Sequence, residues 1–136
     1  MVKPLNILST FSGSSTDRYV LDCLGIDVNY FSSEIDKFAI QCATKNYPDM
    51  TTLGDICKLS YKEGFLYSEK GTFEIGEVDL LVGGSPCQSF SIAGDGTGFD
   101  GKSGLFWEFV RLLEETKPKY FFLENVVMKK RVARCY

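Results

Sequence analysis

The sequence predicts an α/β fold built on a doubly wound, mainly parallel sheet. Short apolar runs typical of buried strands alternate along the 136 residues with segments that have the 3.6-residue period of a helix. Small or polar residues follow the predicted strands, as is typical of a sheet whose strand ends bind a ligand. The composition, 44% hydrophobic and 24% charged residues, is ordinary for a globular protein, so we expect one compact domain.

The first 48 residues contain two predicted strand-helix units. The first strand runs into a turn of small residues that can cap the following helix, and Gly25 ends that helix. Pro48 ends the second helix. The predicted elements are a strand at residues 5–10, a turn at 11–17, a helix at 19–24, a strand at 28–33 and a helix at 36–46.

The remaining residues predict three more strands and one helix. A polar, glycine-containing stretch at residues 60–77 is predicted to be irregular, and a segment rich in Gly, Ser and Asp occupies residues 91–104. Pro118 marks the end of an amphipathic helix that precedes it. The predicted elements are strands at residues 50–53, 78–82 and 120–124 and a helix at 105–116.

The absence of histidine limits the chemistry of this chain. No Ser/His/Asp or Cys/His arrangement is possible, which leaves carboxylates, lysines and thiols. The five cysteines are an odd number without a C-x-x-C pair, so neither a disulfide framework nor a thiolate metal site is predicted. Cys23, Cys42 and Cys57 lie on or beside apolar faces, and we expect them to be small core residues.

The pattern of apolar and charged residues predicts a cytoplasmic protein with no membrane span. No apolar run approaches the roughly 20 residues of a membrane-spanning helix, and the N-terminus lacks a secretory signal pattern. The formal net charge is −3, and four of the 15 basic side chains lie after residue 128. Because an acidic body is a poor partner for phosphate backbones, most of the basic surface needed to bind nucleic acid must come from elsewhere.

The turn after the first strand and Glu34 after the second suggest a nucleoside-containing cofactor. The small residues around Gly13 let the backbone approach a ligand closely, and Glu34 can accept hydrogen bonds from ribose hydroxyls. Because the G-x-G-x-x-G pattern is absent, an uncharged sugar with a zwitterionic tail is a better candidate than a pyrophosphate. Asp55 can accept from an exocyclic amine while Ile56 packs on an adenine ring. The alternatives are a plain turn, a solvated glutamate and a helix-capping aspartate.

Cys87 differs from the other cysteines because it follows a proline in a polar turn at the ligand end of a strand. Pro86 fixes its own φ and biases Ser85 towards extended geometry, which sets the direction of the thiol. A nucleophile is the favoured interpretation, and a structural thiol is the alternative. Glu124, at the end of the adjacent predicted strand, can donate a proton or a hydrogen bond to a substrate ring. Alternatively, it is a surface carboxylate.

Five motifs have an order and spacing that resemble those of the cytosine C5 methyltransferases, which use S-adenosylmethionine. They are Phe11-x-Gly13, Glu34, Gly54-Asp55-Ile56, Pro86-Cys87-Gln88 and Glu124-Asn125-Val126. Residues 84–87, together with residues 105–113, look most like the branch that contains the animal de novo DNA methyltransferases and related microbial and phage enzymes. The resemblance implies the Rossmann-like fold of S-adenosylmethionine-dependent methyltransferases.

The resemblance also implies a covalent mechanism on a cytosine flipped out of double-stranded DNA. Cys87 is expected to add to C6 of the ring while Glu124 hydrogen-bonds or protonates N3, so that C5 takes the methyl group. Asn125 and Gln88 are expected to support this site, and residues 91–104 to close over the base. The residues expected to bind S-adenosylmethionine are Phe11, Ser12, Gly13, Ser14, Ser15, Thr16, Glu34, Ile35, Asp55, Ile56, Ser85 and Pro86.

Two features depart from the family pattern. The first turn reads Phe-Ser-Gly-Ser-Ser instead of Phe-Asp-Gly or Phe-x-Gly-x-Gly. After Val126 the family continues with further strands, an arginine-containing motif, a target recognition domain and a final helix. We therefore expect residues 1–136 to be the N-terminal part of an incomplete catalytic domain, which leaves the fifth strand as an exposed edge and the chain inactive or very weak alone.

Two alternative functions stay open. A related branch methylates cytosine in transfer RNA with the same Pro-Cys and Glu-Asn-Val residues. The other alternative is a non-catalytic module that binds S-adenosylmethionine and associates with a complementing C-terminal chain, or with itself through the exposed sheet edge. None of these interpretations requires a metal.

Overall fold

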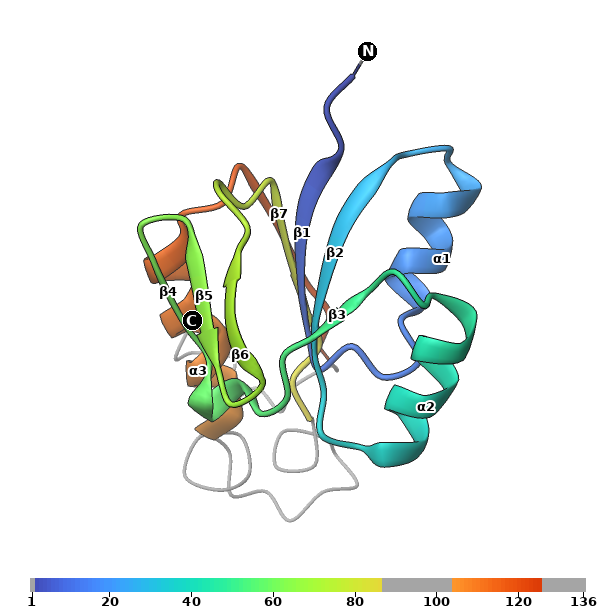
Figure 1. Cartoon of the computed structure of the whole chain (residues 1–136). Helices are drawn as coiled ribbons and strands as arrows, with labels where there is room; N and C mark the ends of the chain where they lie inside the picture. The colour runs from blue at the N-terminus through green and yellow to red at the C-terminus, as the bar shows by residue number, and fades with distance from the viewer. Residues whose placement is uncertain (1, 87–103, 126–136) are drawn as a thin grey trace.

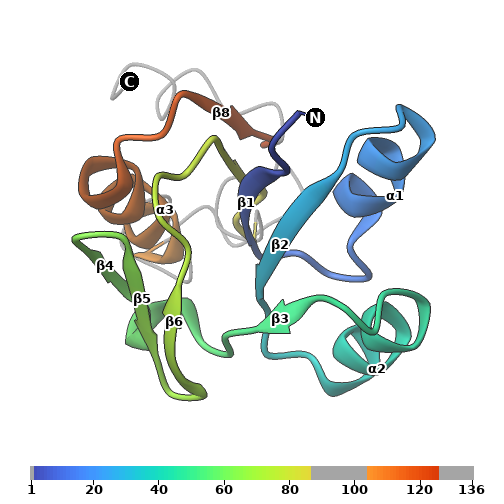
Figure 2. The same ribbon diagram turned by 45° about the horizontal axis from the view of Figure 1, so that its top comes forward.

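The main sheet of the computed structural model consists of five parallel strands in the order β3-β2-β1-β7-β8 (Figure 1 and, for β8, Figure 2). The structure describes residues 2–86 and 104–125, so Cys87, Gln88 and nearly all of the glycine-rich segment at residues 91–104 lie outside the described residues. The predicted α/β class with a mainly parallel sheet is confirmed. The strands are β1 (Leu5–Thr10), β2 (Val28–Ser33), β3 (Thr51–Thr52), β7 (Leu80–Gly83) and β8 (Tyr120–Leu123).

The strand order reverses beside β1. The chain moves outward from β1 to β2 and β3, and later places β7 and β8 on the other side of β1. Thr10 is the register partner of both Ser33 and Gly83, and Gly83 is the partner of Leu123. The segments that follow these four residues therefore start at one edge of the sheet, where ligands bind in sheets of this kind.

Helices lie on both faces of the main sheet. The helices α1 (Thr16–Cys23) and α2 (Lys37–Asn46) lie on one face, whereas α3 (Gly104–Thr116) and a smaller sheet lie on the other (Figure 2). All three predicted helices are confirmed, with shifts of one to three residues at some of their ends. No helix within the described residues combines the length and the hydropathy that crossing a membrane requires.

Two hydrophobic cores flank the main sheet. Adjacent residues of a strand point to opposite faces, so Ile7 joins the core beneath α1 and α2 while Leu8 joins the core beneath α3. The first core has few buried members, namely Ile7, Tyr30, Ala43 and Met50. The second is larger and contains Leu8, Phe31, Leu53, Ile56, Leu59, Leu66, Ile75, Val78, Leu81, Phe109 and Leu112.

The prediction that residues 60–77 are irregular was wrong, because they contain a three-stranded antiparallel sheet. Its strands are β4 (Ser60–Lys62), β5 (Phe65–Ser68) and β6 (Gly71–Glu74). Two residues with positive φ, Glu63 and Gly64, connect β4 to β5, as in a type I′ hairpin turn. Leu66 is fully buried, which anchors this small sheet to the core that includes Phe109 of α3.

Cys23, Cys42 and Cys57 are exposed, so the prediction that they are core residues was wrong. The two helices of the first face bury little: α1 has no buried residue, and α2 buries only Ala43. Cys57 lies in the short 3-10 helix η1 (Ile56–Lys58), where the buried side chain is that of Ile56. Helical spacing in the sequence therefore identified apolar helix faces, but no other described residues pack over most of these faces.

Strand β8 is an edge of the main sheet within the described residues, as expected from the sequence. The side chains of Tyr120, Phe121 and Phe122 are between 59% and 70% exposed. A groove of about 700 Å³ lies between α1, β7 and β8, and mainly apolar side chains line it, including Val20 and Phe122. Apolar surface of this extent usually marks a site of contact with another polypeptide segment.

Candidate functional site

A cavity of about 250 Å³ opens at the carboxyl ends of β1, β2 and β7. Six of the residues that we expect to bind the cofactor line it, namely Phe11, Glu34, Ile35, Asp55, Ile56 and Pro86. The rest of the described lining consists of Ser33, Gly54, Gly84 and Leu105. The structure thus brings together residues that the sequence places at the ends of separate strands.

The turn after β1 brings Phe11 to this cavity through an unusual backbone conformation. Phe11 has a φ of 52° and Ser15 a φ of 63°, in the left-handed region that residues other than glycine seldom adopt. Ser15 N–H closes the turn by donating to Ser12 O at 2.8 Å, and Ser12 Oγ lies 2.6 Å from Ser32 Oγ in β2. Strained backbone of this kind persists where surrounding contacts hold it, and it is concentrated at functional sites.

Glu34 connects the ends of β1 and β2. Its Oε2 accepts from Gly13 N–H at 2.8 Å, and its Oε1 accepts from Ile35 N–H at 2.8 Å and from Asp36 N–H at 3.0 Å. A carboxylate offers about four acceptor sites, and these bonds use three of them. Glu34 therefore keeps about one acceptor site, on Oε2, for a ligand in the cavity.

The turn after β3 forms another wall of the cavity. Ser33 Oγ donates to Gly54 O at 2.8 Å, which fixes this turn to the end of β2. Asp55 Oδ1 accepts from Cys57 N–H at 2.9 Å, so the helix-capping role considered from the sequence is present for one carboxylate oxygen. Ile56 is 4% exposed, and it both lines the cavity and belongs to the core beneath α3.

The charge of the described lining favours a neutral or cationic ligand. Glu34 and Asp55 carry carboxylates, and none of the described lining residues is a lysine or an arginine. A pyrophosphate would meet two carboxylates without a compensating cation. The apolar surface of Phe11, Ile35 and Ile56 suits the flat face of a heterocyclic ring.

Glu124 lines a second, shallower hollow of about 150 Å³, which shares Phe11 and Gly84 with the cavity. The Glu124 N–H donates to Gly83 O at 2.8 Å. Its carboxylate lies over Gly84, where an added Cβ would be 3.0 Å from Oε2. Asn125 follows Glu124 directly after β8. The predicted catalytic carboxylate therefore lies next to residues that line the cavity.

The end of the first turn does not reach the cavity. Ser14 and Ser15 line a different hollow, beside Tyr47 at the end of α2, and Thr16 borders both that hollow and the one that contains Glu124. Ser12 also lines the hollow of Glu124. Of the predicted cofactor-binding residues 11–16, only Phe11 lines the cavity, and Gly13 is connected to it through the bond of its N–H to Glu34.

Residues 85–88 are described only in part. Ser85 is 4% exposed, and its hydroxyl has no hydrogen-bond partner within the part of the chain that the structure describes. Pro86 lines the cavity. Cys87 and Gln88 lie outside the described residues, so their roles stay predictions from the sequence.

Four lining residues were not among the predicted cofactor-binding residues. Ser33 and Gly84 directly adjoin predicted residues at strand ends, and Gly54 belongs to a motif noted in the sequence, so position at a strand end is the signal that finds them. Leu105 comes from the first turn of α3. No local pattern indicates that this turn approaches β1 and β3.

The chain has an α/β fold whose cavity lies at the carboxyl edge of a parallel sheet, the edge at which proteins of this architecture bind their ligands. Residues 5–131 match the family described as C-5 cytosine-specific DNA methylase, and the chain belongs to this family. Among the described residues, no group of three or more cysteine, aspartate or glutamate side chains is placed to hold a metal ion.

Related proteins are much longer than this chain. The orphan methyltransferase M.SPRI of Bacillus phage SPR is 40% identical over 126 residues, which are 90% of this chain and 26% of that protein. The type II methyltransferase M1.ScrFI of Lactococcus lactis subsp. cremoris is 47% identical over 97 residues, 71% of this chain and 22% of that protein. The chain thus spans about a quarter of the length of these relatives.

A solved structure shares the fold. It is that of a prophage-encoded protein from E. coli described as a DNA modification methyltransferase, and it superposes with a TM-score of 0.69 at 24% sequence identity. The match covers 96% of this chain and 35% of that one.

Proposed function

We propose that the cavity binds S-adenosylmethionine and that the chain is part of an enzyme that methylates C5 of cytosine in DNA. The observation that carries the cofactor assignment is Glu34, whose carboxylate faces the cavity with about one acceptor site left for a ribose hydroxyl. The absence of basic side chains from the described lining also suits a ligand with a positively charged sulfonium group.

The other lining residues suit the adenine ring of this ligand. Ile35 and Ile56 offer apolar surface to the two faces of a ring. Asp55 uses Oδ1 to cap η1, so Oδ2 is the atom that accepts from the exocyclic amine. When bound, S-adenosylmethionine supplies an electrophilic methyl group on sulfur.

The chemistry on cytosine is assigned to Cys87 and Glu124. The Cys87 thiolate forms a bond to C6 of a cytosine flipped out of double-stranded DNA, while Glu124 donates a proton to N3. The electron pair released towards C5 makes this carbon the nucleophile. C5 takes the methyl group, and S-adenosylhomocysteine leaves as the product. C5 then loses its proton to a base, the C6–S bond breaks to return the thiolate, and N3 returns its proton, which restores the aromatic ring. The position of Glu124 beside Phe11 and Gly84 supports this assignment.

We propose DNA, and not transfer RNA, as the substrate. The match to a family described as DNA methylases supports DNA, as do relatives named type II methyltransferases. Within this family, we place the chain in the branch that includes the animal de novo enzymes and their phage and microbial relatives. The motif at residues 84–87 supports this placement.

A second candidate function is that of a module that needs another polypeptide to complete the domain. The observation that favours it is the groove beside β8, where Phe121 and Phe122 are 59% and 61% exposed. A complementing chain or a second copy that covers this groove would remove the apolar surface from water. Methyl transfer to DNA only after mixing with a chain that supplies the rest of the domain would identify this function.

Calorimetric titration of the chain with S-adenosylhomocysteine tests the cofactor site. We expect Glu34→Gln to weaken binding by about 10- to 100-fold, because an acceptor for a ribose hydroxyl is lost from a carboxylate. Glu114→Gln, an exposed carboxylate on α3, is the matched control and should bind like the wild type. Equal affinity of all three proteins would rule out the assignment of Glu34.

The nucleophile is tested separately by trapping on duplex DNA that contains 5-fluorocytosine. Fluorine at C5 prevents the elimination that releases the enzyme, so the covalent complex accumulates. In the presence of S-adenosylmethionine and a chain that completes the domain, Cys42→Ala should still form the adduct and Cys87→Ala should not. An adduct with Cys87→Ala would show that another group attacks the base.

A further inference from the structure

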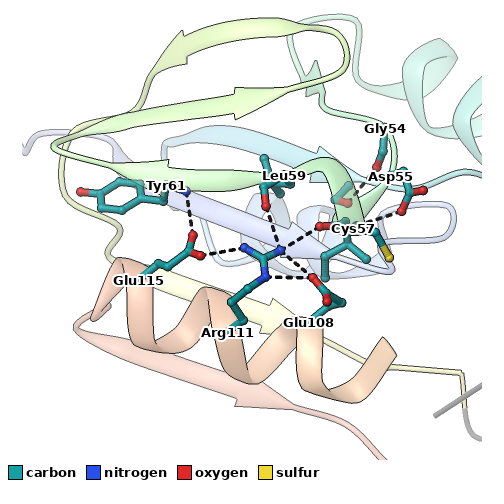
Figure 3. Close-up of polar contacts among 10 residues, drawn as sticks. Gly54, Asp55, Cys57, Leu59, Tyr61, Glu108, Arg111 and Glu115 are labelled. Carbon is teal, nitrogen blue, oxygen red and sulfur yellow. Dashed lines mark hydrogen bonds and ion pairs between the residues drawn. The ribbon is translucent and has the colours of Figure 1, made fainter. Parts of the chain in front are cut away.

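A group of charged side chains on α3 lies behind the wall of the cavity that residues 54–56 form. Glu108, Arg111 and Glu115 are spaced by three and four residues, so they share one face of the helix. Figure 3 shows this face turned towards η1 and the start of β4. The three side chains are between 28% and 32% exposed.

Arg111 joins this helix to the backbone of the turn. Its Nη2 donates to Ile56 O at 3.0 Å and to Leu59 O at 2.8 Å, across more than 50 residues of sequence (Figure 3). The two carbonyls flank the short helix η1, because Ile56 is its first residue and Leu59 follows its last, and Ile56 O also accepts from Leu59 N–H at 3.1 Å. Nη2 carries two hydrogens, which it shares among these two carbonyls and Glu108 Oε2.

Two carboxylates hold the guanidinium in place. Glu108 Oε2 accepts from Nε at 2.9 Å and from Nη2 at 2.7 Å, and Glu115 Oε1 accepts from Nη1 at 2.8 Å. Although burial lowers the pKa of Arg111, bonds to Glu115 and Glu108 raise it on balance, so the group stays cationic. Glu115 also accepts from Tyr61 N–H at 2.9 Å through Oε2, which extends the network to β4.

Ile56 transmits this contact to the cavity. Its carbonyl group binds Arg111 on one side of the turn, and its side chain lines the cavity on the other. Asp55 belongs to the same hydrogen-bonded turn, because its carbonyl group accepts from Lys58 N–H at 3.0 Å while that of Ile56 accepts from Leu59 N–H at 3.1 Å. Arg111 itself is not among the residues that line the cavity.

We infer that Arg111 is a positioning residue for the cofactor site and acts through the turn formed by residues 55–59. The inference rests on the proposed function, because it assigns the turn to cofactor binding. It predicts that substitution of Arg111 loosens this turn locally before it affects the rest of the fold, and that cofactor affinity falls although no contact with the cofactor is removed.

Hydrogen exchange of single amides in the ligand-free chain tests the first part. The informative amides are those of Cys57, Lys58 and Leu59, which donate within the turn to Asp55 Oδ1, Asp55 O and Ile56 O. We expect Arg111→Gln and Arg111→Lys to speed their exchange by about tenfold while amides in β1 and β2 keep the wild-type rates. The matched control is Arg18→Lys, because Arg18 is also paired with two carboxylates, those of Asp22 and Asp49, but lies in α1. Unchanged exchange in the turn would overturn the inference.

Calorimetric titration with S-adenosylhomocysteine tests the second part. We expect about tenfold weaker binding for both Arg111 variants and wild-type binding for Arg18→Lys. Local loosening without a loss of affinity would overturn the inference and leave the proposed function intact. Failure of the wild-type chain to bind would contradict the proposed function, whereas the exchange rates would still decide whether Arg111 holds the turn. If circular dichroism showed both Arg111 variants unfolded, the residue would support the whole fold and the inference would be wrong.

Discussion

Two walls of the cavity at the carboxyl edge of the main sheet are held in different ways. At the ends of β1 and β2, Glu34 binds the N–H groups of the two residues that follow it and of Gly13. The wall after β3 is held from outside the cavity: Glu69 Oε1 accepts from Asp55 N–H at 3.0 Å, and Arg111 donates to Ile56 O. The first wall thus depends on neighbouring strand ends, whereas the second, which Ser33 Oγ also bonds to the end of β2, depends in addition on elements that pack behind it.

This difference implies that the two walls respond to different changes. The wall around Glu34 adjoins β1 and β2, which are largely buried and regularly paired. The wall at residues 54–59 contacts Glu69, in the turn between β5 and β6 of the small antiparallel sheet, and Arg111 of α3. Changes in the small sheet or in α3 should therefore affect one wall and spare the other.

The largest effect is expected from Leu66→Ala in β5. Leu66 is fully buried in the core that contains Leu59 and Phe109. Loss of its side chain leaves a cavity, which typically costs about 2–5 kcal/mol of unfolding free energy. Urea denaturation measures this loss, and hydrogen exchange should show faster opening at residues 54–59 than around Glu34.

Phe65→Ala is the matched control for Leu66→Ala. Phe65 precedes Leu66 in β5 and points to the opposite face, where it is 39% exposed. We expect its substitution to cost about 1 kcal/mol or less. Similar losses for the two variants would show that the small sheet does not pack through Leu66, and the contrast between the two walls would then lack a basis.

Gly54→Ala should have an intermediate effect that is confined to the second wall. Gly54 has a φ of 82°, and a Cβ there would overlap the side chain of Glu69. The backbone conformation alone costs an L-residue about 1–2 kcal/mol, and the overlap would move Glu69 away from Asp55 N–H. We expect lower stability together with weaker binding of S-adenosylhomocysteine, measured by denaturation and calorimetry.

Gly25→Ala separates the loss of stability from the loss of ligand binding. Gly25 has a φ of 67°, but nothing lies within 4 Å of a Cβ added there. It should therefore cost a similar backbone free energy and leave ligand binding unchanged. Equal loss of affinity in Gly25→Ala and Gly54→Ala would mean that affinity follows global stability and not the contact with Glu69.

The sequence predicts the first wall better than the second. Buried parallel strands are apolar runs bounded by small residues, so β1 and β2 are found at their observed limits, and Phe11 and Glu34 follow from the strand ends. The strands of the small sheet have only three or four residues and are largely exposed, so they lack a continuous apolar run. The adjacent pair Glu63-Gly64 is the local signal of a hairpin that could have identified it.

The residues behind the second wall could not be inferred from local patterns. Arg111 binds Ile56 and Leu59 through backbone carbonyl groups, which every residue has, so side-chain identity at those positions carries no signal. Glu69 likewise binds the N–H of Asp55. The prediction that Cys23, Cys42 and Cys57 are core residues was wrong for a related reason. Helical spacing shows which residues share a face, but not what covers that face.

The smallest effect is expected from Glu69→Gln, which tests the weaker of the two contacts behind the second wall. The substitution keeps an oxygen that can accept from Asp55 N–H but removes the charge that pairs with Lys58 Nζ at 2.9 Å. Because such exposed ion pairs are weak and screened by salt, we expect affinity for S-adenosylhomocysteine to fall within about threefold. Calorimetry at low and high salt measures this change, and Glu74→Gln in β6 is the control.

The pH dependence of the difference in stability between Glu69→Gln and the wild type gives a sharper test of this contact. The bond with Lys58 and then the bond with Asp55 N–H lower the pKa of Glu69. A carboxyl group with a lowered pKa stabilises the folded state above its unfolded pKa, about 4.3, and this contribution is lost as the pH falls through the folded value. Glu69→Gln should therefore be less stable than the wild type at neutral pH and should approach it in acid. A difference that stays constant from pH 7 to pH 3 would show that the charge of Glu69 does not hold the turn, leaving Arg111 as its support from outside the cavity.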